Sequence, residues 1–396
     1  MTTQPLPQSR PPGIARLTDA IWVGIPLVLR RFSTGLAVSS VDGLYLAARP
    51  AAGLIGPPAM LFAGFVAGAT HPGFTYVFTE ALWLLLFLAA VGAISGALGL
   101  YLTAGFIIGD LVFGAHPQWE RVALRDNFTA PAEFGSLLVT YALFALLAVG
   151  VPIAAKTFAA EFRLPPRTPR PLRALVGLGA LVIISGLLVW VWTQSAPLLV
   201  RPVFVWADFR PTVEAMFTTQ EQGGLIVAVA VAATIARAVF QAILANPIGT
   251  AQTALSDRMT HLENRFRTDK PVIPLLSRMP LILRLMVRAA LLTAVLAGLY
   301  SAYWQAALTF VVLGLAQFLT SPLMPLNLGA YARFMNRVPR ILRLLIVMVP
   351  VFVLGALILP IFIDQESFLP FLILALIGAV LMTLLSPQTR DGEESR

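Results

Sequence analysis

Cysteine is absent from this chain of 396 residues, and only three histidines are present. The lack of cysteine excludes a disulfide framework, thiolate metal ligands, iron–sulfur clusters and thiol nucleophiles. No histidine lies inside a long apolar run, which argues against haem, and neither a His-Glu-x-x-His zinc motif nor a Walker A sequence occurs. We therefore expect no cofactor, no metal site and no enzymatic activity.

Charged residues are also scarce. They make up 12% of the chain, whereas hydrophobic residues make up 58% and the mean hydropathy is +0.82. Soluble proteins hold about 25% charged and about 45–50% apolar residues. A soluble domain of this length has no room to bury so much apolar surface, so the composition predicts an all-α, polytopic transmembrane helix bundle with no sizeable soluble domain.

Long stretches without Asp, Glu, Lys or Arg predict the membrane spans, because crossing the bilayer core takes about 20 apolar residues. One stretch, Ala289–Ala332, is too long for a single helix, and we divide it at Tyr303–Trp304–Gln305, whose side chains suit the interface. The resulting nine spans are roughly 51–70, 81–108, 134–155, 174–200, 223–246, 286–303, 306–325, 344–363 and 367–386.

The distribution of cations predicts the orientation, because Lys and Arg near span ends favour the cytoplasm. Eighteen cations lie in alternate connections and at the C-terminus, against four in the intervening connections. This asymmetry places the C-terminus inside and accounts for the net charge of +9, so nucleic-acid binding is not needed to explain that charge. Lysine is almost replaced by arginine, as in GC-rich bacterial genomes, and we expect a bacterial plasma (inner) membrane protein.

The N-terminal part leaves the number of spans open between nine and ten. Nine spans with an inside C-terminus put Met1 outside, although the N-terminal arginines favour the inside. A tenth span at 32–48, which carries Asp42, resolves the conflict, and so do three shorter crossings within 50–113. The chain then divides into an N-terminal segment with an interfacial helix or weak span at 1–49 and a helical bundle at 50–396, with cytoplasmic elements at 156–173, 247–288 and 326–343.

Arg237 is the one charge well inside an apolar run. A cation at the centre of a transmembrane helix costs about 2.5–3.5 kcal/mol on insertion scales, so it must snorkel, face water or pair with an acid. Glu80 and Asp110, at the edges of apolar runs, are the candidate partners. Together these three residues are candidates for a polar pathway.

Glycine and proline are frequent in the first span. Gly64 and Gly68, spaced four apart, favour close helix packing. Pro57 and Pro58 favour instead an interrupted helix that exposes backbone carbonyls to a substrate, because proline removes a helical hydrogen bond. Both interpretations stay open.

Two basic or amphipathic elements face the predicted cytoplasmic side. A proline-rich strap carries Arg163, Arg167, Arg170 and Arg173, and suits contact with anionic headgroups. In the second element, within 247–288, apolar residues recur at helical spacing and charged residues occupy the other faces. Either element is alternatively a docking site for a cytoplasmic or membrane protein partner. The second element's stripe includes Leu255, Met259, Leu262 and Phe266.

Two classes of function follow. The first is a transporter or permease that moves a small solute or lipid, indicated by Arg237 and the proline-rich first span. The second is a non-catalytic membrane subunit that anchors or assembles a larger complex, indicated by the missing catalytic motifs and by the basic strap.

Overall fold

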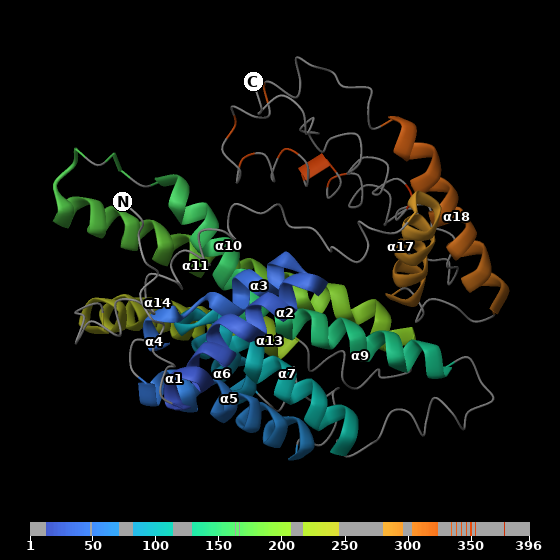
Figure 1. Ribbon diagram of the computed structural model, residues 1–396. Coiled ribbons are helices and arrows are strands. Elements are labelled where there is room, and N and C mark those ends of the chain that lie inside the picture. The colour runs from blue at the N-terminus through green and yellow to red at the C-terminus, as the bar shows by residue number, and fades with distance from the viewer. Residues whose placement is uncertain are drawn as a thin grey trace, which may run out of the picture.

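The computed structural model describes seven stretches of the chain, and each regular element within them is a helix (Figure 1). This confirms the predicted all-α bundle. The stretches are 13–47, 50–70, 82–113, 129–206 without Arg163 and Pro166, 217–244, 280–295 and 303–323, joined by a few single residues after 330.

Five helices in the described stretches are long and apolar enough to cross a membrane. They cover Ala52–Thr70, Gly96–Phe113, Leu137–Phe162, Pro171–Ala196 and Gly223–Gln241. The elements that contain them are α5 (Pro50–Thr70), α7 (Gly96–Phe113), α9 (Thr129–Ala145) continuing into η3 (Leu146–Gly150), α10 (Val151–Ala159) and η4 (Ala160–Phe162), α11 (Arg170–Trp206) and α14 (Gly223–Leu244). The spans predicted at 344–363 and 367–386 fall outside these stretches.

The stretch 81–108 is not one continuous span but belongs to two helices, so three helices lie within 50–113, as the alternative of three shorter crossings expects. Helix α6 (Leu82–Ile94) ends at Ser95 and α7 starts at once in a new direction. A Cβ on Gly99 would lie 3.1 Å from the Cα of Gly92, whereas seven residues of a continuous helix cover about 10 Å. The chain therefore folds back at Ser95 into a tight helical hairpin.

Helices α5 and α7 form the most intimate contact of the bundle. A Cβ on Gly64 would lie 2.0 Å from the carbonyl oxygen of Leu102, and a Cβ on Gly105 would lie 2.0 Å from that of Leu61. Gly68 and Gly109 repeat this one turn along, so the two helices are parallel and each presents a Gly-x-x-x-Gly face. The packing interpretation of these glycines is confirmed.

The paired prolines do not interrupt α5, so the expected break in this helix is wrong. The helix is continuous from Pro50 to Thr70. Pro57 has no N–H to donate to the carbonyl of Gly53 four residues earlier. The buried indole Nε1 of Trp22 donates to that oxygen instead, at 2.9 Å, which satisfies the freed acceptor and lets the helix continue.

Two other prolines coincide with single turns of π-helix. Helix η1 (Ala20–Gly24) precedes Pro26, and η3 precedes Pro152. In both, the residue before the proline donates its N–H five residues back, to Ala20 and Leu146 respectively. The shared sequence Val-Gly-Ile/Val-Pro explains this, because the proline cannot make its own bond and the chain accommodates an extra residue.

The N-terminal segment lies on the bundle as a series of short helices (Figure 1). It contacts α5, α7 and α14. Its elements are α1 (Gly13–Asp19), η1, α2 (Ile25–Phe32), α3 (Thr34–Val41) and α4 (Leu44–Ala47).

The predicted division of the long uncharged stretch is confirmed. Helix α17 (Leu281–Val295) and helix α18 (Tyr303–Leu323) pack against each other, and α18 begins at Tyr303 (Figure 1). Helix α13 (Phe217–Glu221) is a short turn before α14.

Candidate functional site

A buried carboxylate, Asp42, lies at the turn between α3 and α4 and faces the break between α6 and α7. The turn depends on Gly43, whose φ of 110° is in the left-handed region that favours glycine. A Cβ on Gly43 would also lie 2.0 Å from Oγ of Ser95. The main chain of Asp42 is tied to the same break, because Ser95 Oγ and Ala97 N donate to its carbonyl oxygen at 2.8 and 3.0 Å.

The side chain of Asp42 accepts hydrogen bonds from three directions. Arg237 on α14 donates from both terminal nitrogens, at 2.9 Å to Oδ1 and 3.0 Å to Oδ2. Lys156 on α10 donates to Oδ2, and so does the main-chain N–H of Gly96, at 2.7 Å. We call Asp42, Lys156 and Arg237 the ion cluster. Its two ion pairs join the N-terminal segment to α10 and α14, and hydrogen bonds to Gly96 and Ile94 join it to the hairpin.

The ion cluster also satisfies the helix ends at the break. The first turn of α7 leaves N–H groups without helical partners and carries a partial positive charge, which the Asp42 carboxylate complements through Gly96. The last turn of α6 carries a partial negative charge. Its Ile94 carbonyl accepts bonds from Arg237, at 3.1 Å, and from the hydroxyl of Tyr45, at 2.8 Å. A break that exposes backbone polar groups is therefore matched by side chains of the correct sign.

These charges are largely hidden from solvent. The exposed fraction of the side chain is 6% for Asp42, 8% for Arg237 and 14% for Lys156. Burial alone raises the pKa of the Asp42 carboxyl, but the charges and hydrogen bonds of Arg237 and Lys156 outweigh it and hold this pKa well below its usual range. Burial also raises the pKa of Tyr45 to about 12, so its hydroxyl keeps the proton that it donates.

The structure places Arg237 inside the bundle, and its acidic partner is Asp42. Neither acid that we proposed from the sequence takes this place in the described chain. Asp110 accepts a hydrogen bond from Tyr141, a contact between α7 and α9. Glu80 lies outside the described residues. Pro57 and Pro58 lie inside α5 and are not part of the ion cluster.

Sequence reasoning missed two members of the ion cluster. From the sequence, Lys156 is only the first residue of the cytoplasmic element 156–173, and Asp42 is only a charge within the possible span 32–48. A signal was available, because Asp42 stands in the apolar stretch 32–48 directly before a glycine. An acid in such a stretch needs a cation as much as Arg237 needs an acid.

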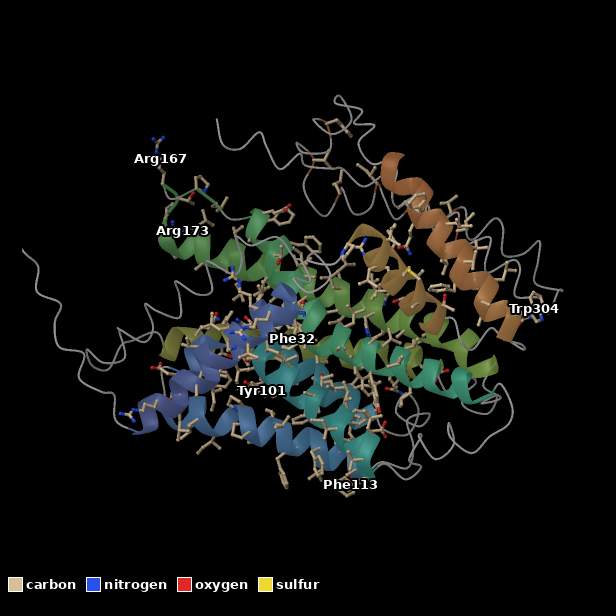
Figure 2. All side chains as sticks on the ribbon, turned by 45° about the vertical axis from the view of Figure 1, so that its right-hand side comes forward. Phe32, Tyr101, Phe113, Arg167, Arg173 and Trp304 are labelled. Atoms are coloured by element: carbon tan, nitrogen blue, oxygen red, sulfur yellow. The ribbon has the colours of Figure 1, made fainter. Side chains whose placement is uncertain are left out.

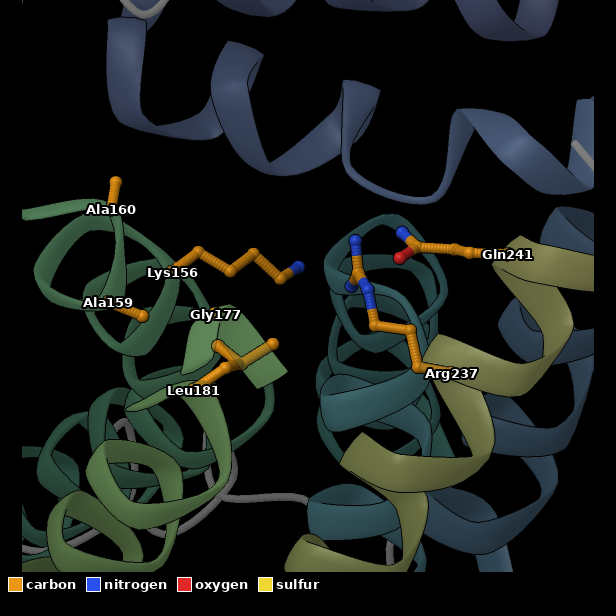
Figure 3. A pocket seen from close by; sticks show the side chains of 7 residues that line it. All are labelled: Lys156, Ala159, Ala160, Gly177, Leu181, Arg237 and Gln241. Carbon is orange, nitrogen blue, oxygen red and sulfur yellow. The ribbon is translucent and has the colours of Figure 1, made fainter. Parts of the chain in front are cut away.

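A pocket opens beside the ion cluster, between α10, η4, α11 and α14 (Figure 3). Its volume is about 210 Å³. Lys156 and Arg237 point toward one another across it, and the amide of Gln241, one turn after Arg237, lies beside the guanidinium. The remaining lining residues are Ala159, Ala160, Gly177 and Leu181.

The predicted docking residues are only partly described. Arg167 is exposed at the connection between α10 and α11 and points away from the bundle, with Arg173 close by at the start of α11 (Figure 2). Arg170 begins α11. Arg163 lies outside the described residues, and so does the amphipathic stripe of Leu255, Met259, Leu262 and Phe266.

Comparison of the chain with models of protein families, with curated proteins and with solved structures finds no match. Within the described stretches, no group of three or more His, Asp or Glu side chains is placed to hold a metal ion. The fold therefore defines the class, an all-α polytopic helical bundle with a charged site at a helix break.

Proposed function

We propose that the protein is a transporter or permease that moves a small solute or lipid, and that the ion cluster is the centre of its pathway. The main observation behind this proposal is that Asp42 forms ion pairs with Arg237 and Lys156 at a break between two apolar helices. Broken helices at transport sites expose helix ends and carbonyls to substrates and ions. Ionisable groups buried among apolar helices are costly, and they mark pathways more often than they stabilise a fold.

The surroundings of the break also support a functional site. The π-turn η3 places the carbonyl oxygen of Ala148 against the hairpin, 2.3 Å from where a Cβ on either Gly92 or Gly99 would lie. Trp22, in the π-turn η1, packs on Ala97 just after the break. Single π-turns are frequent at functional sites.

The test is flux in proteoliposomes. Purified protein is reconstituted, and uptake of labelled phosphate, lactate, alanine and glucose is measured together with translocation of a fluorescent phospholipid. We expect one of these to exceed empty liposomes, and Arg237→Ala to reduce it by about tenfold or more while leaving a monodisperse, inserted protein.

Gly179→Ala is the matched control, because a Cβ on Gly179 meets nothing within 4 Å and this residue lies away from the pocket. Its flux should equal that of the wild type. Wild-type protein that moves none of these solutes, or full flux in Arg237→Ala, would contradict the proposal.

We further propose that the protein lies in a bacterial plasma membrane with its C-terminus and the Arg167 connection in the cytoplasm. The excess of cations on that side supports this orientation. Anionic headgroups are the expected partners of Arg167 and Arg173 there.

A second candidate is a non-catalytic membrane subunit that anchors or assembles a larger complex. The observation that favours it is the exposed side chain of Arg167 on a proline-rich connection. Deletion of residues 164–171 should then release a partner that co-purifies from native membranes in mild detergent. Retention of every partner by the deletion variant would count against it.

A further inference from the structure

We infer that the pocket between α10, α11 and α14 binds a phosphate group, either as inorganic phosphate or as the headgroup of an anionic phospholipid such as phosphatidic acid. The inference deepens the proposed transport function, on which its physiological role rests, by naming the chemistry of the substrate. The binding itself is independent of transport and is tested separately.

The polar side chains of the pocket are donors of the kind that phosphate oxygens accept. Lys156 brings an ammonium group, Arg237 a guanidinium group and Gln241 an amide. Lysine and arginine have no acceptor atoms, and the lining residues that the structure describes include no carboxylate. The Asp42 carboxylate behind them balances one of their two positive charges, so one positive charge remains. The pocket therefore favours an anion over a cation or a neutral solute.

The arrangement suits a tetrahedral oxyanion. Arg237 holds the two oxygens of Asp42 with its terminal nitrogens, so in the pocket its guanidinium acts on a phosphate as a charged group fixed in place, and Lys156 acts as a point charge. Lys156 and Arg237 approach from facing helices, with Gln241 beside the guanidinium (Figure 3). Donors from two sides can bind different oxygens of one phosphate group.

Asp42 prepares both cations from behind the pocket. It binds Lys156 and Arg237 but does not line the pocket itself. The third hydrogen bond of Arg237, to the Ile94 carbonyl, restricts the guanidinium further. Because these long side chains are already fixed, they lose less conformational entropy when a ligand binds.

The size of the pocket limits the ligand. Its volume of about 210 Å³ is below the roughly 300–1,000 Å³ of pockets for drug-sized molecules. One phosphate group with a few waters, each taking about 30 Å³, is of the right scale. The small lining residues Ala159, Ala160 and Gly177 provide this space without adding polar groups.

The position of the pocket gives phosphate a route to it. Lys156 is three residues from the end of α10, and Gly177 is seven residues into α11, so the pocket lies about 10 Å from the basic connection. Arg167 is exposed on that connection (Figure 2). A basic entrance raises the local concentration of anions.

The test is binding to the full chain in a neutral detergent, read from the rise in thermal unfolding temperature. The probes are inorganic phosphate and phosphatidic acid in mixed micelles, with chloride and phosphatidylcholine as the matched comparisons. We expect a saturable rise with at least one phosphate probe and none with its comparison. A rise with inorganic phosphate identifies the free ion as a ligand, and a rise with phosphatidic acid alone identifies the headgroup.

Two leucine substitutions on α11 distinguish an effect on the pocket from an effect on folding. Gly177→Leu adds a bulky side chain to the lining of the pocket, and the backbone has room for it because a Cβ there meets nothing within 4 Å. Gly179→Leu makes the same change in open space outside the pocket. We expect Gly177→Leu to weaken phosphate binding about tenfold or more and Gly179→Leu to change it by less than about twofold.

No rise with either phosphate probe, or an equal rise in Gly177→Leu and Gly179→Leu, would overturn the inference. Failure here is distinguishable from failure of the transport proposal. Flux of another solute without phosphate binding would contradict only the phosphate site. Phosphate binding without any flux would contradict only transport.

Discussion

Among single residues, one carboxylate and the glycine after it hold the ion cluster in place. Asp42 accepts four hydrogen bonds through its two oxygens, from Arg237, Lys156 and the main chain of Gly96. Gly43 allows the turn that presents this carboxylate and leaves room for Ser95. Each of these roles has a separate experimental signature.

Replacement of Gly43 by alanine should be strongly destabilising. Holding an alanine in the left-handed region destabilises the folded state by about 1–3 kcal/mol. In addition, the new Cβ would lie 2.0 Å from Ser95 Oγ. Ser95→Gly removes the colliding atoms but also the bond from Ser95 to the Asp42 carbonyl. In the double variant the loss of unfolding temperature should therefore be smaller than the sum of the single losses. Additive losses would show that the two residues do not meet.

The charge of Asp42 should make the free energy of unfolding depend on pH only at acidic pH. Its folded-state pKa is held below the unfolded value of about 3.9, so its contribution is present above that value and is lost as the pH falls toward the folded pKa. We expect wild type to exceed Asp42→Asn by about 3–5 kcal/mol in free energy of unfolding, because the variant removes one partner of buried ion pairs.

This difference should stay constant between about pH 5 and 8 and narrow below about pH 4. The exposed Glu221→Gln is the matched control, and its stability should stay within about 0.5 kcal/mol of wild type. A difference between wild type and Asp42→Asn that changes near neutral pH would contradict an ionised Asp42 at that pH.

At the scale of elements, glycine and proline decide where helices approach, bend and break. Close packing of α5 on α7 needs the missing side chains of Gly64, Gly68, Gly105 and Gly109. Proline deletes one N–H, and its effect depends on what satisfies the freed carbonyl. Trp22 does so for Gly53, and α5 continues.

Gly64→Ala should separate α5 from α7. The added Cβ would lie 2.0 Å from the Leu102 carbonyl oxygen and 2.8 Å from the Phe106 nitrogen, both main-chain atoms that cannot rotate away. We expect a loss of about 1–3 kcal/mol, measured by unfolding in detergent. Gly179→Ala makes the same change where the Cβ meets nothing within 4 Å, and it should be neutral or slightly stabilising. Equal stabilities of the two variants would refute the close contact.

The sequence predicts the helical class and the division at Tyr303 because hydropathy and interfacial aromatic residues are local signals. It does not predict the break at Ser95, because the residues that compensate for it come from Asp42, 53 positions earlier, and Arg237, 143 positions after Ile94. Only the three-dimensional structure brings such distant residues together. The continuity of α5 through Pro57 depends likewise on Trp22, 31 residues before Gly53.

In the whole molecule, the ion cluster lies where the N-terminal segment packs on the helical bundle. It links the N-terminal segment to the hairpin and to two apolar helices, α10 and α14. The pocket opens on the side of this cluster nearest the basic connection.

The two ends of α11 should be accessible from opposite sides of the membrane. Gln220, close to Glu221, donates to the carbonyl of Gln194 at 3.0 Å, and Gln194 is 24 residues into α11, about 36 Å from its start. This exceeds the hydrocarbon thickness of about 30 Å. Because the chain has no cysteine, Arg167→Cys and Glu221→Cys each introduce a unique label.

A membrane-impermeant maleimide applied to intact spheroplasts should label Glu221→Cys, and it should label Arg167→Cys only after permeabilisation. Labelling of both from one side would contradict the crossing by α11. Labelling of Arg167→Cys alone would reverse the orientation that the positive charges predict.

The ion pair between Asp42 and Arg237 can be measured by a double-mutant cycle. The free energy of unfolding is measured in detergent for wild type, Asp42→Asn, Arg237→Gln and the double variant. Because these side chains form a buried two-bond ion pair at 2.9 and 3.0 Å, we predict a coupling of about 1–3 kcal/mol, with the double variant less destabilised than the sum of the singles. A coupling within about 0.3 kcal/mol of zero would contradict the ion cluster and the proposals built on it.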